Sequence, residues 1–406
     1  MSVIAPFKAL RPQAQYAKQV ASPPYDVLNS KEAKEEARGN PYSFLHITKA
    51  EIDLGDNTDV HDKAVYEKAK DNLHAFMQRE VVFKENKACY YIYRLVMNGK
   101  SQTGLVCTSS VDDYDNNVIK KHEFTRPEKE QDRINHITIT GAQTGNVFLA
   151  YKNVAELDEL IEKWTTEKSP VYDFVAEDGI SHTIWIVTDD KVIDAITTIF
   201  KNKVDATYIA DGHHRAASAA KVRLANKSEG ADYFLTTLFP ASQLYIMDYN
   251  RVVRDLNGLS KEAFLEKIAI HFDVRSNGKE AVSPPRLHDI GMYLDKEWFV
   301  LKAKPGTYTE DPIGILDVTI LQNNLLDPIL GIKDQRTDKR IDFVGGIRGL
   351  KELEKRVDSG EMKVAFSLYP VSIHQLFDIA DSGNVMPPKS TWFEPKLRDG
   401  LLTHLI

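Results

Sequence analysis

The segment "YIADGHHRAASAA", Tyr208 to Ala220, constrains the fold of this chain more than any other stretch. A short apolar run is followed by an aspartate, a glycine, two histidines and an arginine, and then by a stretch rich in alanine. Short apolar runs bounded by turn residues are typical of buried strands, and alanine has the highest helix propensity. The order predicts a strand that ends at Ala210, a turn at residues 211–214 and a helix from Arg215 onward.

A turn of this composition suits a phosphate group. The N-terminus of a helix presents backbone N–H groups and a partial positive charge. Gly212 lets the backbone approach a ligand closely, and Arg215 can donate two hydrogen bonds to one phosphate. We therefore predict a phosphate-binding turn made by Gly212, His213, His214 and Arg215.

Asp211 does not fit that role, because a carboxylate and a phosphate repel each other. Three roles would explain it: an N-cap of the helix, a metal ligand, or a base that accepts a proton from an attacking hydroxyl. A capping aspartate beside two solvated histidines is the simplest structural alternative. A zinc site on His213 and His214 is disfavoured, since adjacent histidines on a turn rarely converge on one ion without further ligands.

The rest of the chain mixes hairpins and helices. The segment around Asn98–Gly99 predicts a tight hairpin, and residues 154–167 and 192–202 have helical character. This mixture predicts an α+β fold rather than a doubly wound sheet. We divide the 406 residues into a core at 1–255 and a C-terminal α/β region at 256–406 that contributes a basic loop to the site. The looser stretch at 275–289 is interpreted as a loop inside the second region.

Composition excludes several classes of protein. The formal net charge of −7 argues against a chain that coats DNA or an anionic membrane, because such binding needs excess positive charge. No apolar run approaches the roughly 20 residues that span a bilayer. The two cysteines form no CxxC pair, and the first residues lack a signal-peptide pattern. We expect a cytoplasmic protein with no membrane partner.

The segment "KKHEFTRPEKEQDR" gathers charged residues before a predicted helix start at Pro127. A solvated helix face is the structural alternative for such alternating charges. Residues just ahead of a helix often carry function, so Glu123 is a candidate base or metal ligand. His122, Arg126 and Arg133 are candidate substrate-binding residues.

Two segments rich in proline complete the candidates. In "ASPPYDVLN", a rigid Pro-Pro fixes Tyr25 and Asp26, and Asp26 either binds an amino group or a metal, or closes a turn. In "PPKSTWFEPK", two ammonium groups and two hydroxyls in a constrained loop suit an oligophosphate. No Walker loop occurs in the chain. The predicted phosphate ligands of this segment are Lys389, Ser390, Thr391 and Lys396.

Together these motifs resemble a known superfamily. "ADGHHR" ahead of an alanine-rich helix is similar to the signature of the ParB/sulfiredoxin-like superfamily, and its "DGHHR" form is similar to that of free L-serine kinases. The whole chain resembles a longer bacterial and archaeal family, long of unknown function, through "SPPYDVLN", "HEFTRPEKEQDR", "YNRVV" and "MPPKSTWFEPK". The resemblance implies a kinase that makes O-phosphoserine from serine and pyrophosphate. For such a reaction we expect pyrophosphate or a nucleotide as the donor, Mg²⁺ as the cofactor, and Asp211 and Glu123 as catalytic residues.

A rival from another class is a non-catalytic module that binds CTP or ATP, as in the partition-protein branch of the superfamily. The acidic charge balance and the lack of a basic helix-turn-helix run weaken this alternative, and nucleic acid is not an expected partner. A sulfiredoxin-like reductase needs a cysteine in the turn, which has none. The choice among pyrophosphate, ADP, ATP and CTP, the acceptor and the oligomeric state stay open.

Overall fold

The computed structural model describes residues 1–55 and 57–406 and divides into two compact units. The first comprises Met1–Lys121, Thr125–Leu244 and Pro395–Ile406, and the second comprises His122–Phe124 and Tyr245–Glu394. The division therefore falls ahead of residue 255, and the last twelve residues return to the first unit. Helices account for about 36% and strands for about 26% of the structure, which confirms the predicted α+β class.

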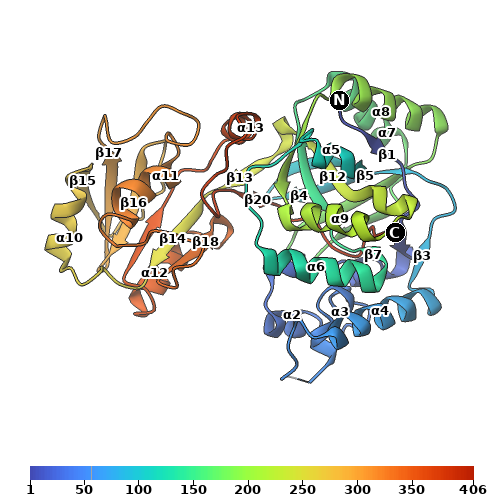
Figure 1. The fold of residues 1–406 in the computed structure, drawn as a ribbon, viewed down its shortest axis with the longest axis horizontal. Coiled ribbons are helices and arrows are strands. Elements are labelled where there is room, and N and C mark those ends of the chain that lie inside the picture. Colours follow the sequence, from blue (N-terminus) through green and yellow to red (C-terminus); the bar gives the residue numbers. More distant parts are fainter. Residues whose placement is uncertain (56) are drawn as a thin grey trace. The chain divides into compact units, whose positions relative to one another are not determined.

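The described part of the first unit is built on a nine-stranded mixed sheet with the order β6-β11-β8-β12-β5-β4-β10-β9, and β1 pairs with β5 (Figure 1). β11 runs parallel to β6 and antiparallel to β8, which runs parallel to β12. The strands are β1 (Ile4–Ala5), β4 (Tyr90–Met97), β5 (Lys100–Ser110), β6 (Ile119–Lys120), β8 (Val147–Tyr151), β9 (Tyr172–Val175), β10 (Ser181–Val187), β11 (Thr207–Asp211) and β12 (Tyr233–Pro240).

Helices surround this sheet, with α6 beside α9 and α4 beside α6 (Figure 1). Two short strand pairs, β2 (Leu10–Pro12) with β3 (Val82–Lys84) and β7 (Ala142–Gln143) with β21 (His404–Leu405), tie the chain ends to the unit. The helices are α1 (Ala17–Val20), α2 (Ser30–Glu36), α3 (Leu45–Thr48), α4 (Lys63–Gln78), α5 (Val111–Asp115), α6 (Pro127–Thr140), α7 (Ala155–Glu167), α8 (Asp190–Lys203) and α9 (His213–Ala225).

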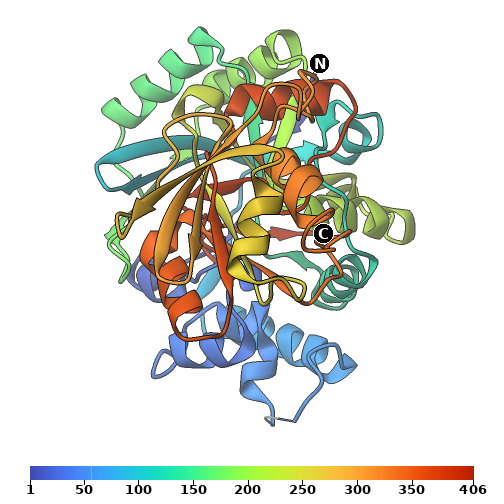
Figure 2. The ribbon, with the colours of Figure 1, turned by 90° about the vertical axis from the view of Figure 1, so that its left-hand side faces the viewer.

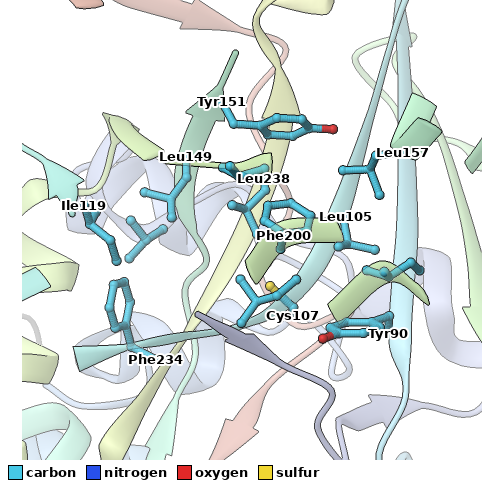
Figure 3. Close-up of a cluster of buried hydrophobic side chains, with 14 of the residues drawn as sticks. Tyr90, Leu105, Cys107, Ile119, Leu149, Tyr151, Leu157, Phe200, Phe234 and Leu238 are labelled. Carbon is cyan, nitrogen blue, oxygen red and sulfur yellow. The ribbon is translucent and has the colours of Figure 1, made fainter. Parts of the chain in front are cut away.

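A buried apolar cluster holds the sheet and its helices together (Figure 3). Burial of such side chains stabilises the fold by roughly 25 cal/mol for each Å² removed from water. Cys107 belongs to this cluster, and both cysteines are buried thiols without a disulfide. The side chains labelled in the figure are Tyr90, Leu105, Cys107, Ile119, Leu149, Tyr151, Leu157, Phe200, Phe234 and Leu238.

The second unit carries its own antiparallel sheet, of six strands in the described residues, with the order β15-β17-β16-β19-β14-β18 (Figure 2). β13 (Tyr245–Met247) and β20 (Trp392–Glu394) form a separate pair. The sheet strands are β14 (Tyr249–Val253), β15 (Phe272–Gly278), β16 (Asp289–Leu294), β17 (Glu297–Ala303), β18 (Ile341–Gly345) and β19 (Val364–Ser367). The helices are α10 (Lys261–Ile268), α11 (Asp317–Leu321), α12 (Leu350–Asp358) and α13 (Ile373–Asp381).

Local sequence signals explain several element boundaries. Asn98 and Gly99 both have positive φ, of 51° and 76°, as a two-residue hairpin turn requires, and they join β4 to β5 as predicted. Pro127 opens α6 at its first position, also as predicted. None of the helices that the structure describes is long and apolar enough to cross a membrane.

Candidate active site

The candidate site begins where β11 meets α9. β11 extends through Asp211 and α9 starts at His213, so the predicted four-residue turn is a single residue, Gly212. Gly212 is also the N-cap position of α9, and therefore Asp211 is not the capping residue. The register of β11 against β8 shifts between Ile209 and Asp211. Such a bulge re-aims the next side chain, here the carboxylate of Asp211.

Gly212 makes this direct junction possible. Its φ is +99°, a left-handed conformation that side chains rarely adopt. A Cβ atom at this position would lie 3.1 Å from Nε of Arg215 and 3.4 Å from Cα of Val147. The turn thus needs glycine both for its backbone angle and for space.

Asp211 forms ion pairs with two cations from different segments. Its Oδ2 atom lies 3.3 Å from an Nη atom of Arg215, one helical turn ahead on α9. The same atom lies 3.2 Å from Nζ of Lys396, in the segment that returns from the C-terminus. The sequence predicts that Lys396 contacts a phosphate, and in the structure its ammonium group forms an ion pair with Asp211.

Arg215 is buried and joins three parts of the first unit. Its guanidinium donates to the carbonyl of Asn146, and it lies 3.4 Å from Oδ2 of Asp26 as well as beside Asp211. Burial lowers the pKa of Arg215, but the carboxylates of Asp26 and Asp211 outweigh that effect and raise it overall. Only 9% of the side chain is exposed. Arg215 is therefore placed to hold the two carboxylates in position.

Asp399 is a member of the site that the sequence did not indicate. It is 2% exposed, and its main chain pairs with that of Ser22. A Cβ atom on Gly145 would lie 3.3 Å from Cδ of Arg215 and 3.5 Å from Oδ1 of Asp399, so both side chains pack on the same glycine. Burial raises the pKa of Asp399 to about 7, Arg215 opposes the rise and Asp26 adds to it.

Tyr25 and Arg133 pack against each other beside Arg215 and line a pocket. The guanidinium of Arg133 lies 3.9 Å from the centre of the Tyr25 ring and 2.7 Å from Oδ2 of Asp132. Both side chains line a small, partly open pocket together with Arg215 and Gly145. Burial raises the pKa of the Tyr25 phenol. The pocket thus reaches Arg215, which contacts Asp26 and Asp211 outside its lining.

The two histidines differ in their surroundings. His213 is buried at the start of α9. The Nε2 atom of His214 accepts a hydrogen bond of 3.0 Å from the backbone N–H of Arg126. Arg126 therefore contacts the start of α9 through its main chain, while its side chain is exposed. Within the described residues, no group of three or more His, Cys, Asp or Glu side chains is arranged to hold a metal ion.

The remaining candidates belong to the second unit. The segment His122–Phe124 is grouped there, and the carbonyl of His122 accepts a hydrogen bond from the backbone of Met386. Glu123 lies in that segment. Lys389 is exposed, Ser390 is buried and donates to the carbonyl of Pro387, and Thr391 is half-buried. The roles of these residues stay predictions.

Sequence comparison places the chain in a family. The model of DUF1015, described as a protein of unknown function, matches residues 4–319, which is more than half of the chain. The chain belongs to this family. The match includes Asp26, Asp211 and Arg215, whereas Lys396 and Asp399 follow its end. A comparison with curated protein sequences finds no match.

Several solved structures are similar to this chain at low identity. One is a free serine kinase variant in complex with AMP, at 12% identity and a TM-score of 0.39, covering 71% of this chain and 86% of that one. Another is a conserved hypothetical protein from Pyrococcus furiosus, at 15% identity and a TM-score of 0.38, covering 74% and 94%. A truncated SbnI from Staphylococcus aureus matches at 11% identity and a TM-score of 0.35, covering 74% and 87%.

Proposed function

We propose that this protein is a small-molecule kinase that transfers a phosphoryl group from pyrophosphate or a nucleotide to the hydroxyl of free L-serine. The observation that carries the proposal is the position of Asp211, at the end of β11 and directly before the N-terminus of α9. A carboxylate there can accept a proton from an alcohol while the helix N-terminus binds the phosphates of the donor. The choice of serine rests on the resemblance of the "DGHHR" segment to free L-serine kinases.

Phosphoryl transfer depends on placement and on charge neutralisation, and the residues of the site can divide these tasks. Asp211 acts as the base. Gly212 and the first residues of α9, His213 and His214, hold the donor. Asp26 receives the ammonium group of serine. Arg215 acts as a positioning residue, because it contacts both Asp26 and Asp211 and is buried. Tyr25 and Arg133 line the acceptor pocket.

Mg²⁺ fits this set of ligands. The ion prefers oxygen and is commonly held by one or two carboxylates together with substrate phosphates. Asp26 and Asp211 both direct an Oδ2 atom at the same Nη atom of Arg215, so their carboxylates are close neighbours. When bound, the ion would neutralise charge on the donor phosphates. Glu123, His122, Arg126, Lys389, Ser390, Thr391 and Lys396 remain proposed contributors to catalysis or binding.

The direct test is a search for phosphoserine. The purified protein is incubated with L-serine, Mg²⁺ and, in parallel, pyrophosphate, ADP, ATP or CTP, and the products are followed by phosphorus NMR and mass spectrometry. We expect O-phosphoserine with at least one donor and none when serine is omitted. Tight binding of CTP or ATP with no product from any donor would instead support the non-catalytic nucleotide-binding module.

A further inference from the structure

Arg251 is a buried cation in the middle of the second unit. It lies on β14, which pairs with β18 on one side and with β19 on the other. Its side chain is fully buried, with 0% of the residue exposed. Arginine is rarely buried so completely unless a carboxylate accompanies it, because removing an isolated charge from water is costly.

The groups that accept hydrogen bonds from Arg251 are all neutral. Its guanidinium donates to Oε1 of Gln335 at 3.4 Å, to the carbonyl of Pro388 at 3.1 Å and to the carbonyl of Tyr249. No carboxylate of the described chain forms an ion pair with it, and the ring of Phe343 lies 5.3 Å away. Burial lowers the pKa of Arg251 to about 9, so the side chain stays protonated at neutral pH. The positive charge is therefore uncompensated.

This charge contacts the loop of residues 387–391, in which Lys389 is exposed. Pro388, which accepts the hydrogen bond from Arg251, immediately precedes Lys389. Lys389 has a φ of +59°, a conformation that is costly for a residue with a side chain and that the surrounding structure must impose. Ser390 closes the turn by donating to the carbonyl of Pro387 at 2.7 Å. Arg251 thus helps to fix the backbone that carries Lys389.

Aromatic contacts hold the other side of the loop against β14. The ring of Trp392 packs edge-on against Tyr249, with ring centres 5.0 Å apart. Nζ of Lys389 lies 5.7 Å from the centre of the same Tyr249 ring. The fold therefore brings Arg251 of "YNRVV" and Lys389 of "MPPKSTWFEPK" to the same part of the second unit, although the two residues are far apart in the sequence.

We propose that the 387–391 loop of the second unit is an oxyanion site that takes phosphate or pyrophosphate, with Lys389 as the contacting residue and Arg251 as a positioning residue. A buried charge acts through a low dielectric, so its field at the nearby surface is strong and attracts an anion. The ammonium group of Lys389 and the hydroxyl of Thr391 can donate to the oxygens of a phosphate, whereas the Ser390 hydroxyl donates to the carbonyl of Pro387 and fixes the turn. The inference rests on the proposed function only for the identity of pyrophosphate as the natural anion.

The experiment measures protection of Lys389 in the full-length protein. Lysines are acetylated with a limiting reagent in the presence of increasing pyrophosphate or inorganic phosphate, and each site is quantified by peptide mass spectrometry. We expect pyrophosphate to slow acetylation of Lys389 and to leave Lys279, an exposed lysine of the same unit, unchanged. Sulfate at equal ionic strength shows whether the site prefers phosphates.

Two variants test the role of Arg251. Arg251→Met removes the charge but keeps an apolar stem, and we expect the pyrophosphate concentration for half-protection of Lys389 to rise about tenfold or more. The matched control is Arg275→Met, on β15, which three strands separate from β14. If Arg251→Met does not fold, Lys389→Asn is used instead to test the anion site, since asparagine tolerates positive φ. That variant should bind one pyrophosphate fewer per chain than the wild type, as measured by isothermal titration calorimetry.

The outcomes separate this inference from the proposed kinase activity. Protection of Lys389 without phosphoserine from any donor would support the anion site and reject the kinase. Phosphoserine formation with Lys389 acetylated at the same rate at saturating pyrophosphate would reject the anion site alone. If folded Arg251→Met needs the same pyrophosphate concentration for half-protection of Lys389 as the wild type, Arg251 plays no part in the anion site.

Discussion

Nζ of Lys396 lies 3.2 Å from Oδ2 of Asp211, although the two residues are 185 positions apart. This contact depends on the return of residues 395–406 to the first unit, where Asp399 also joins the site. The C-terminal segment is therefore part of the candidate site and not only of the fold. Lys396 and Arg215 approach Asp211 from two different segments, so they restrict the orientation of its carboxylate.

The first prediction concerns Asp211 as the base. Asp211→Asn keeps the size of the side chain but removes its ability to accept a proton, so phosphoserine formation should fall about 10²–10⁴-fold. The assay is the initial rate with the best donor, and circular dichroism shows that the fold is retained. The control is Asp205→Asn, an exposed aspartate just before β11, which should keep the full rate. Near-normal activity of Asp211→Asn would exclude Asp211 as the base.

The second prediction concerns the junction at Gly212. Gly212→Ala should lower the free energy of unfolding by more than the about 1–2 kcal/mol that a left-handed residue with a Cβ costs, because that atom would press on Arg215. Gly179→Ala separates the two effects, since Gly179 also has positive φ, at +81°, but nothing lies within 4 Å of its Cβ position. Urea denaturation measures the free energy of unfolding of both variants. Equal losses would show that the contact with Arg215 has no energetic weight.

The third prediction concerns Arg215. Arg215→Met removes a buried guanidinium that contacts the partly exposed carboxylates of Asp26 and Asp211, and loss of such a charged hydrogen bond typically destabilises a protein by about 1.5–3 kcal/mol. Arg223→Met serves as the control on the same helix, because its ion pairs with Asp112 and Asp232 are near the surface and should contribute no more than about 1 kcal/mol. Chemical denaturation gives the free energy of unfolding of both variants and of the wild type. A loss for Arg215→Met no larger than for Arg223→Met would contradict the positioning role.

The sequence predicts the local part of this site and misses the part that depends on tertiary packing. The strand, the glycine and the helix at residues 207–225 follow from apolar patterning and helix propensity, and the spacing of Asp211 and Arg215 suits contact across one helical turn. Asp399 stands before a glycine in a segment without periodicity, so its sequence context reads as an ordinary turn. Its main-chain pairing with Ser22 helps to bring it to Arg215, and no local pattern encodes that pairing.

The start of α9 and the burial of Arg251 also depend on the folded structure rather than on local sequence patterns. The predicted turn of four residues is one residue, because a glycine with positive φ can join a strand to a helix directly. Arg251 would be expected at a surface from its residue type alone. Its burial is set by β18 and β19, which flank β14 and come from segments about 90 or more residues later.

The last prediction concerns the pH dependence of stability at Asp399. Its folded-state pKa of about 7 is far above the value of about 3.9 for an unfolded aspartate. Between these values the native state holds a proton that the unfolded state has released. The contribution of Asp399 to the free energy of unfolding is therefore fully present at low pH. It is lost as pH rises toward 7, by up to about 1.4 kcal/mol per pH unit.

The charges near Asp399 oppose one another, since Arg215 and Arg133 lower its pKa and Asp26 raises it. Buried histidines act in the opposite direction on stability, because burial lowers the pKa of His136 to about 4. The measurement must therefore be a difference between two proteins that share those histidines. Asp399→Asn imitates the protonated carboxyl, so the unfolding free energy of the wild type minus that of the variant should fall from pH 4 to pH 7 and flatten above it. Asp173→Asn, an exposed site on β9, should give a constant difference. A constant difference for Asp399→Asn as well would show that Asp399 is ionised throughout this range.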